Sequence, residues 1–135
     1  MPVGPQGGGV RLKASEAETG GWCSVWEGRV EAGMVGAGLH FHRARDEFFF
    51  VLEGELELRL GEESQVVRAG TFAFVPRGTV HGFRNPGAET AALLVVHHPA
   101  GFERYFEELR GLLERGGSRE DRVALAERFD MFSAS

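Results

Sequence analysis

Short apolar segments, separated by glycine, proline and asparagine, occupy residues 10–100 of the chain. In residues 56–60, for example, three leucines alternate with a glutamate and an arginine. A period of two places apolar side chains on one face of a β-strand and polar side chains on the other. Many short strands with regular turn signals indicate an antiparallel sandwich or barrel. The strands expected on this basis cover residues 10–14, 21–32, 47–52, 56–60, 65–68, 71–75, 80–84 and 91–97, with one more around His40 and His42.

Residues 47–52 depart from this alternation, because one glutamate precedes five apolar residues. A continuous apolar run of this length is typical of a strand that is buried on both faces. By parity, Phe49 shares a face with Glu47, and we expect Phe48 and Phe50 to pack on the opposite face against the other sheet or a helix.

Two tryptophans in the segment 21–32 also follow the strand period. Alternation places Trp22, Ser24 and Trp26 on one face. We expect both indoles to anchor the core or an interface, with a pocket wall as the alternative.

The pattern changes after Pro99 to one with helical spacing. Apolar residues recur at three- and four-residue intervals from Phe102 to Leu113, and charged residues occupy the opposite face. Two glycines at 116–117 end this helix, and Ser118 then serves as the N-cap of a second one. The apolar face predicts packing on the outside of the barrel, across its mouth or on a second subunit. The expected parts of the chain are a flexible tail at residues 1–9, a barrel at 10–100 and helices within 101–132.

Composition excludes several classes of function. At 135 residues the chain is long enough for one domain with a substantial core. A net charge of -5, without a basic cluster, argues against a nucleic-acid partner. The lone Cys23 excludes an internal disulfide and fits a reducing, cytoplasmic environment. Residues 1–10 contain no apolar run, so neither a signal peptide nor a membrane span is expected there.

Two histidines separated by one residue are the first candidates for metal ligands in the sequence. On a β-strand, His40 and His42 project from the same face, and Glu47 can reach the same space from the next strand. Neutral imidazoles and a carboxylate are ligands for divalent transition metals. Asp46 is an alternative carboxylate, and the two arginines that precede it fit either an anionic substrate or a solvated loop.

A second ordered set of residues lies further along the chain. Gly70, Pro76, Gly78, His81 and Asn85 follow one another with gaps of five, one, two and three residues. Taken alone, this spacing predicts a strand, a tight turn and a short strand that carries one histidine. Because a single histidine near a turn is more often structural than a ligand, this segment alone does not indicate a site.

The two sets together resemble the bipartite motif of the cupin family. The first part, Gly-x5-His-x-His-x4-Glu-x6-Gly, matches at His40, His42, Glu47 and Gly54. Only its leading glycine is replaced, by Met34. The second part, Gly-x5-Pro-x-Gly-x2-His-x3-Asn, matches at every position of the second set.

The resemblance implies an all-β fold, an antiparallel jelly-roll barrel, here with a C-terminal helical extension. It implies that His40, His42, Glu47 and His81 hold one divalent transition metal ion, which would be Fe, Mn, Ni, Cu or Zn. Four protein ligands leave positions open for substrate or dioxygen. The expected activity is therefore a dioxygenase-type oxidation of a small apolar organic substrate. Glu47 is the catalytic candidate, as a carboxylate that leaves the metal and acts as a base.

Other functions remain open at this point. The same barrel can serve as a non-catalytic, metal-containing module that binds a small molecule, or as a metal-dependent isomerase or lyase. A purely structural metal site is a further possibility. The start of the C-terminal helices resembles small single-domain bacterial cupins of the quercetin-dioxygenase-like branch, and membership of the family implies a homodimer.

Four further residues are candidates for the pocket. Phe49 and Phe83 share strand faces with the expected carboxylate and imidazole ligands. His97 and His98 end the last strand, where alternation turns only one of them inward. That histidine is expected to orient a ligand or to exchange protons.

Overall fold

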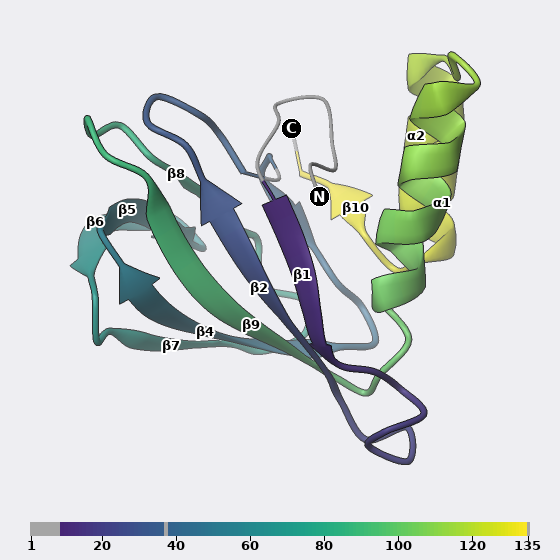
Figure 1. Cartoon of the computed structure of the whole chain (residues 1–135), viewed down its shortest axis with the longest axis horizontal. Helices are drawn as coiled ribbons and strands as arrows, with labels where there is room; N and C mark the ends of the chain where they lie inside the picture. The colour runs from purple at the N-terminus through teal and green to yellow at the C-terminus, as the bar shows by residue number, and fades with distance from the viewer. Residues whose placement is uncertain (1–8, 37, 135) are drawn as a thin grey trace.

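The computed structural model describes residues 9–36 and 38–134, and it consists of two five-stranded antiparallel sheets and two helices (Figure 1). The β4 sheet contains, in spatial order, β1 (Gly9–Ala14), β2 (Ser24–Val30), β9 (Ala91–His98), β4 (Asp46–Glu53) and β7 (Phe72–Val75). The β5 sheet contains β10 (Phe132–Ser133), β3 (His40–Phe41), β8 (His81–Arg84), β5 (Glu55–Leu60) and β6 (Glu63–Arg68). The helices are α1 (Glu103–Glu114) and α2 (Arg119–Arg128). The expected all-β antiparallel fold with a C-terminal helical extension is confirmed.

The N-terminal part of the chain differs from expectation at two points. The predicted tail at residues 1–9 lies outside the described residues except for Gly9, which begins β1. The second strand begins at Ser24 rather than at residue 21, because Gly20 and Gly21 adopt positive φ angles of 64° and 84° in the preceding turn. Trp22 therefore lies before the strand and is 60% exposed, whereas Trp26 is buried.

The strand expected around His40 and His42 is only two residues long. It lies between β8, where His40 is opposite His81, and β10, where Phe41 is opposite Phe132. The sequence pattern did not predict β10, because two residues are too few to show a period. The C-terminal segment thus completes the sheet that carries the histidines.

Strand register brings chemically active residues from distant parts of the chain into pairs. Glu47 of β4 is opposite His97 of β9, and His40 of β3 is opposite His81 of β8. All four side chains are buried between the two sheets. Residues two apart on a strand share a face. A register shift of one residue would therefore turn all the inward side chains of that strand outward.

Apolar side chains from the inner faces of both sheets form the core. Leu56 and Leu58 of β5 meet Phe49 and Val51 of β4 across the interior. The remaining buried members of this cluster are Trp26, Val30, Val67, Val75, Ala91, Leu93 and Val95.

The outer face of β4 is exposed, so the prediction that residues 47–52 are buried on both faces is wrong. Phe50 is 39% exposed, and its neighbours Phe72 and Phe74 on the edge strand β7 are 61% and 47% exposed. Phe48 and Phe50 do not pack against the other sheet or a helix; the Phe48 ring contacts that of Phe74 instead, at 5.0 Å between centroids. A two-layer antiparallel fold leaves one face of each sheet uncovered, whatever its composition.

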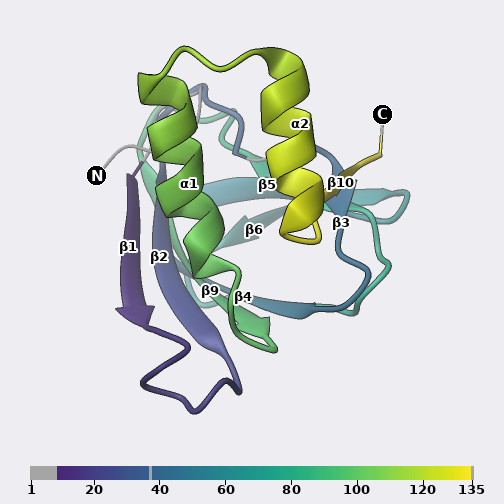
Figure 2. The same ribbon diagram turned by 90° about the vertical axis from the view of Figure 1, so that its right-hand side faces the viewer.

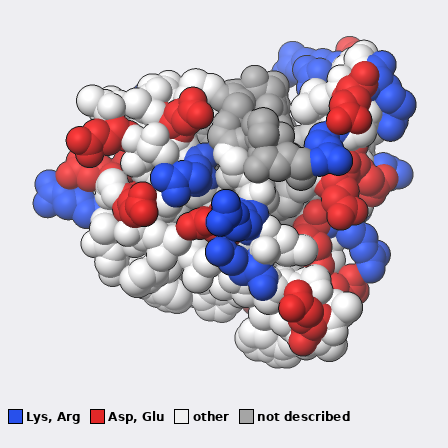
Figure 3. Space-filling model, viewed as in Figure 1, with Lys and Arg blue, Asp and Glu red and all other residues white. Residues whose placement is uncertain are grey.

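This surface, here called the outer phenylalanine face, consists of Phe48, Phe50, Leu52, Phe72 and Phe74. Figure 3 shows the surface over β7 and the adjoining part of β4, at the lower left, as an area largely without charged side chains. Exposed apolar patches of this kind commonly mark contact surfaces.

The two helices lie in front of one end of the β-sandwich (Figure 2). Phe106 of α1 packs on the core, and its ring meets the Trp26 indole edge to face at 4.9 Å between centroids. Ser118 caps α2 as expected, because its side chain accepts from the Asp121 amide while the Asp121 carboxylate accepts from the Ser118 amide. None of the helices in the described part of the chain is long and apolar enough to span a membrane.

Asn85, the last residue of the second motif, has a structural role. Its buried side-chain amide donates to the carbonyls of Val30 and Glu89, at 2.9 and 2.7 Å, and its carbonyl accepts from the Gly87 amide at 3.0 Å. These bonds tie the end of β2 to the turn between β8 and β9. The motif therefore includes residues that hold the strands in place as well as residues with metal-binding chemistry.

Candidate metal centre

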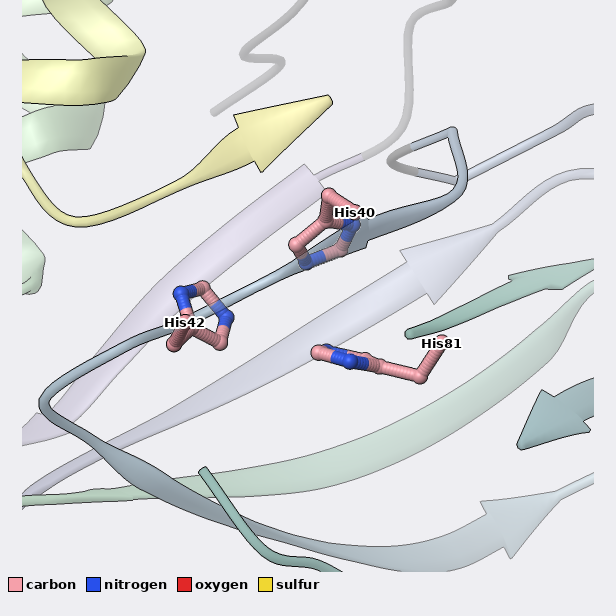
Figure 4. A group of neighbouring side chains, drawn as sticks. All are labelled: His40, His42 and His81. Carbon is pink, nitrogen blue, oxygen red and sulfur yellow. The ribbon is translucent and has the colours of Figure 1, made fainter. Parts of the chain in front are cut away.

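Four histidines and one glutamate meet between the two sheets. His40, His42 and His81 come from the β5 sheet or the loop after β3, and Glu47 and His97 come from the β4 sheet. Figure 4 shows the rings of His40, His42 and His81 directed towards a common space. The ligand atoms of these three residues lie within 4.8 Å of one another, as do those of His42, Glu47 and His97. The structure therefore brings together all four of the expected ligands and adds His97.

Backbone carbonyls orient three of the imidazoles. The Nδ1 atoms of His40, His42 and His81 lie 2.6, 2.8 and 2.9 Å from the carbonyl oxygens of Gly38, Asp130 and Thr79, respectively. A carbonyl can only accept, so each Nδ1 carries the proton and donates it. The Nε2 of each neutral ring is then left with a free lone pair, which is the form that binds a metal.

The Glu47 carboxylate lies against this group. Its Oε2 is 2.9 Å from His81 Nε2, and its Oε1 is 3.4 Å from His42 Nε2. Both nitrogens are buried and have no hydrogen-bond partner among the described residues. Buried polar atoms without a partner are costly, and a divalent cation beside a carboxylate satisfies both of them. The residues present thus fit a metal ion.

The electrostatics of the group favour a positive charge beside Glu47. Burial by itself raises the pKa of Glu47, but His97, His42 and His81 outweigh this effect and hold its pKa well below its usual range. Burial lowers the pKa of His40 to about 3, so this ring is neutral. For His81, burial lowers the pKa, but the Glu47 carboxylate outweighs it and raises the pKa overall. A positive charge, whether a proton or a metal ion, is therefore most favourable between Glu47 and His81.

The other candidates from the sequence occupy different places. Asp46 points away from the centre and pairs with Arg77, with 3.1 Å between Oδ2 and Nη2, so it is not the alternative ligand. Phe49 and Phe83 lie beside the centre, and their rings are 5.7 Å apart between centroids. His97 is the histidine that alternation turns inward. His98 is not a pocket residue, because it faces outward and its ring lies against the Trp22 indole, tilted by 36°.

The sequence pattern missed Asp130, which connects the C-terminal segment to the centre. Its carbonyl accepts from His42, and its carboxylate accepts from the amides of Arg43 and Ala44, both at 2.8 Å. Asp130 has a φ of 65°, a left-handed conformation that Asp tolerates better than most residues. An Asp shortly after a predicted helix carries no pattern that distinguishes it from a surface residue.

Arg45 reinforces this connection through its hydrogen bonds to backbone carbonyls. Its guanidinium donates to the carbonyls of Phe129 and Ala100, at 3.1 and 3.4 Å, and its Nε donates to that of Pro99 at 3.3 Å. The loop after β3 is therefore held by both ends of the helical extension.

A cavity of about 350 Å³ opens beside the centre. His40, His42 and Glu47 form part of its wall. Residues of both helices form another part of its wall, which fits the expected position across the mouth of the barrel. The aromatic residues that line the cavity are Trp26, Phe49, Phe83, Phe102, Tyr105 and Phe106. An apolar cavity of this size with a few convergent polar groups is typical of a small-molecule site.

Comparison with known proteins identifies relatives of this fold and site. The family model described as "Cupin domain" matches residues 26–97, slightly more than half of the chain. A solved structure from Thermus thermophilus has a TM-score of 0.63 and 31% identity, over 73% of this chain and 90% of that one. A sugar phosphate isomerase of the cupin superfamily from Silicibacter pomeroyi has a TM-score of 0.58 and 29% identity, over 67% and 59% of the two chains.

One curated relative matches over a shorter part of the chain. Quercetin 2,3-dioxygenase of Bacillus subtilis is 41% identical over 46 residues, which are 34% of this chain and 14% of that protein. The chain spans about half the length, or less, of the first curated relatives it matches. The resemblance inferred from the two motifs is confirmed, including a distant relation to a quercetin dioxygenase.

We expect Asp130→Ala to release the loop after β3. The amides of Arg43 and Ala44 would lose their acceptors, and the free energy of unfolding should fall by about 1 to 3 kcal/mol. Amide hydrogen exchange resolved by NMR should show faster exchange at both positions. Asp130→Asn keeps one carboxamide oxygen and the tolerance of positive φ, so its effect should be intermediate. Unchanged exchange in Asp130→Ala would contradict the role assigned to this carboxylate.

Proposed function

The chain belongs to the cupin family, and from this premise we propose that it is a metal-dependent enzyme that oxidises a small, largely apolar organic compound with dioxygen. The observation that carries the proposal is the pair of buried, unpartnered Nε2 atoms of His42 and His81 beside an ionised Glu47. This group borders a largely apolar cavity, whose lining includes six Trp, Phe and Tyr rings. A metal-binding set that opens onto an apolar cavity favours chemistry over a closed structural site.

The proposed ligands of the ion are His40, His42 and His81 through Nε2, and Glu47 through its carboxylate. The donor set suits Fe, Mn, Ni, Cu or Zn in the divalent state. When bound, such an ion supplies Lewis acidity and open coordination positions for substrate and dioxygen. The carbonyls that hold the three Nδ1–H groups keep the rings in the metal-binding tautomer before any ion arrives.

The chain's own residues would position the substrate and move its proton. Phe49, Phe83 and Phe102 offer flat apolar surfaces on which a small aromatic or unsaturated compound can pack. The helices form the far wall of the cavity and cover it on that side. Glu47 faces the same cavity as an ionised carboxylate and is the group we assign as the base that takes a proton from the bound substrate.

Two other functions use the same residues. An isomerase or lyase would use Glu47 as a base without consuming dioxygen, and one solved relative is titled a sugar phosphate isomerase. The apolar lining of the cavity favours a less polar substrate than a sugar phosphate. A non-catalytic module would bind a ligand in the cavity and leave it unchanged.

We expect chelator-treated protein to take up about one divalent metal ion per chain. His81→Ala should reduce the metal that remains after dialysis to less than about a tenth of the wild-type amount, because an imidazole ligand is lost. His98→Ala is the matched control, since this histidine lies outside the centre and should leave metal content unchanged. Metal analysis by mass spectrometry measures all three proteins. Equal metal content in the wild type and His81→Ala would refute the metal centre.

We expect metal-loaded protein to consume dioxygen with at least one member of a panel of phenols, diketones and thiols. Glu47→Gln should lower the turnover number by about 10²-fold or more, because a general base is lost. An oxygen electrode measures the rate, and the metal content of the variant is determined in the same samples. Conversion of a compound without oxygen uptake would favour the isomerase or lyase, and binding without conversion would favour the module.

We also propose that the chain forms a homodimer through the outer phenylalanine face. A twofold dimer needs only a patch that is complementary to itself. Phe50 and Phe72, which lie opposite one another on β4 and the edge strand β7, are both exposed and uncharged. Exposed apolar patches rimmed by polar residues commonly mark protein–protein interaction sites.

The double variant Phe72→Asp/Phe74→Asp should be monomeric, because two buried charges would oppose the interface. Sedimentation velocity should then change from twice the chain mass of 14.8 kDa to a single chain mass. Val66→Asp is the control, since Val66 is also an exposed apolar residue, 58% exposed, but lies on the edge strand of the other sheet. A monomeric wild type, or dissociation by the Val66 variant alone, would contradict this interface.

A further inference from the structure

His97 contacts the metal centre, yet its hydrogen bonds differ from those of the other three histidines. The Nε1 of Trp26 lies 3.1 Å from His97 Nδ1, and both side chains are buried. An indole N–H can donate but never accept. His97 Nδ1 must therefore accept, which means that it carries no proton.

The proton of His97 consequently lies on the opposite nitrogen. A neutral imidazole has one N–H, so Nε2 carries it and donates to Glu47 Oε1. The ring is packed in place by Phe102, at 4.4 Å between centroids, and β9 holds it opposite Glu47 in register. A chain of two hydrogen bonds thus runs from Trp26 through His97 to one oxygen of Glu47.

The tautomer of His97 is the reverse of that in His40, His42 and His81. In those rings a carbonyl accepts from Nδ1 and leaves Nε2 free, whereas in His97 the indole occupies Nδ1 and leaves Nε2 protonated. A protonated ring nitrogen has no lone pair for a metal. Although His42, Glu47 and His97 are close enough to form a second candidate metal triad, this tautomer excludes it.

We propose that Trp26 and His97 are positioning residues that determine which oxygen of Glu47 binds the metal. His97 occupies Oε1 with a hydrogen bond, and Oε2, 2.9 Å from His81 Nε2, is left to face the ion. Glu47 would therefore bind a metal ion through one oxygen, because presenting both oxygens would break its hydrogen bond to His97. This inference rests on the proposed metal centre, but the tautomer on which it depends exists without the metal.

The first measurement therefore uses metal-free, ¹⁵N-labelled protein. Long-range ¹H–¹⁵N correlation spectra of the histidine rings distinguish the two neutral tautomers. We expect the Nε2–H form for His97 and the Nδ1–H form for His40, His42 and His81. An Nδ1–H form of His97 would overturn the proposal, whether or not the protein binds metal.

The second measurement compares Co²⁺ binding and the Co²⁺ visible absorption spectrum among variants. His97→Ala should weaken Co²⁺ binding by about 10- to 100-fold and alter the spectrum, because Oε1 becomes free to coordinate. His97→Gln can present an amide N–H to Oε1, so it should restore affinity to within about threefold of wild type and restore the spectrum. Trp26→Phe keeps an aromatic ring but removes the indole N–H, and we expect about a 3- to 10-fold loss.

Three results separate the explanations. Wild-type affinity and spectrum in both His97→Ala and Trp26→Phe would overturn the positioning role. A loss in His97→Ala as severe as that in His81→Ala, without rescue by His97→Gln, would show that His97 is itself a ligand and overturn the proposal. Failure of the wild type to bind Co²⁺ would refute the proposed function, while the tautomer spectra would still decide the hydrogen-bond chain. His98→Gln, which changes a histidine outside the centre, is the control for nonspecific effects, and thermal unfolding checks that each variant is folded.

Discussion

An ionised carboxylate buried between two sheets is the constraint on which the rest of the site depends. Burial of a charge without partners is prohibitively unfavourable, so Glu47 requires donors or cations on every side. Imidazoles surround it, and each is held by a group further out: Thr79 and Asp130 hold two of them by their carbonyls, and Trp26 holds the third by its indole. The outer groups decide which ring nitrogen carries the proton, and therefore which rings offer a lone pair to a metal and which offers a hydrogen bond.

The C-terminal extension is part of this site and not an addition to a finished barrel. Asp130 orients His42 and holds the loop after β3, while Arg45 of that loop binds carbonyls at both ends of the extension. The same helices form one wall of the cavity. The extension thus both lines the cavity and holds His42, one of the expected metal ligands, by a hydrogen bond.

The apolar run at residues 47–52 shows where a composition argument fails. A strand with apolar residues on both faces satisfies the pattern for full burial, yet in this chain only the face with Glu47, Phe49 and Val51 is inside. Composition shows that both faces of the strand are apolar. It does not show whether another element of the fold covers each face. Within the described part of the chain no element covers the second face, which is why it becomes a candidate contact surface instead of core.

The sequence by itself determined the strand pattern, the two helices and the residues of the two motifs, including His40, His42, Glu47 and His81. The strands, turns and helices follow from local rules, because strand period, turn residues and helical spacing are each set within a few positions. The grouping of His40, His42 and Glu47 with His81 followed from the resemblance of the two motifs to the cupin family. Only the tertiary structure decided the roles of His97, Trp26 and Asp130, and that Asp46 is not a ligand. Those roles depend on strand register, on the path by which the C-terminal segment returns, and on the partner that fixes each tautomer. Such long-range contacts join residues far apart in the chain, and no local pattern of side chains encodes them.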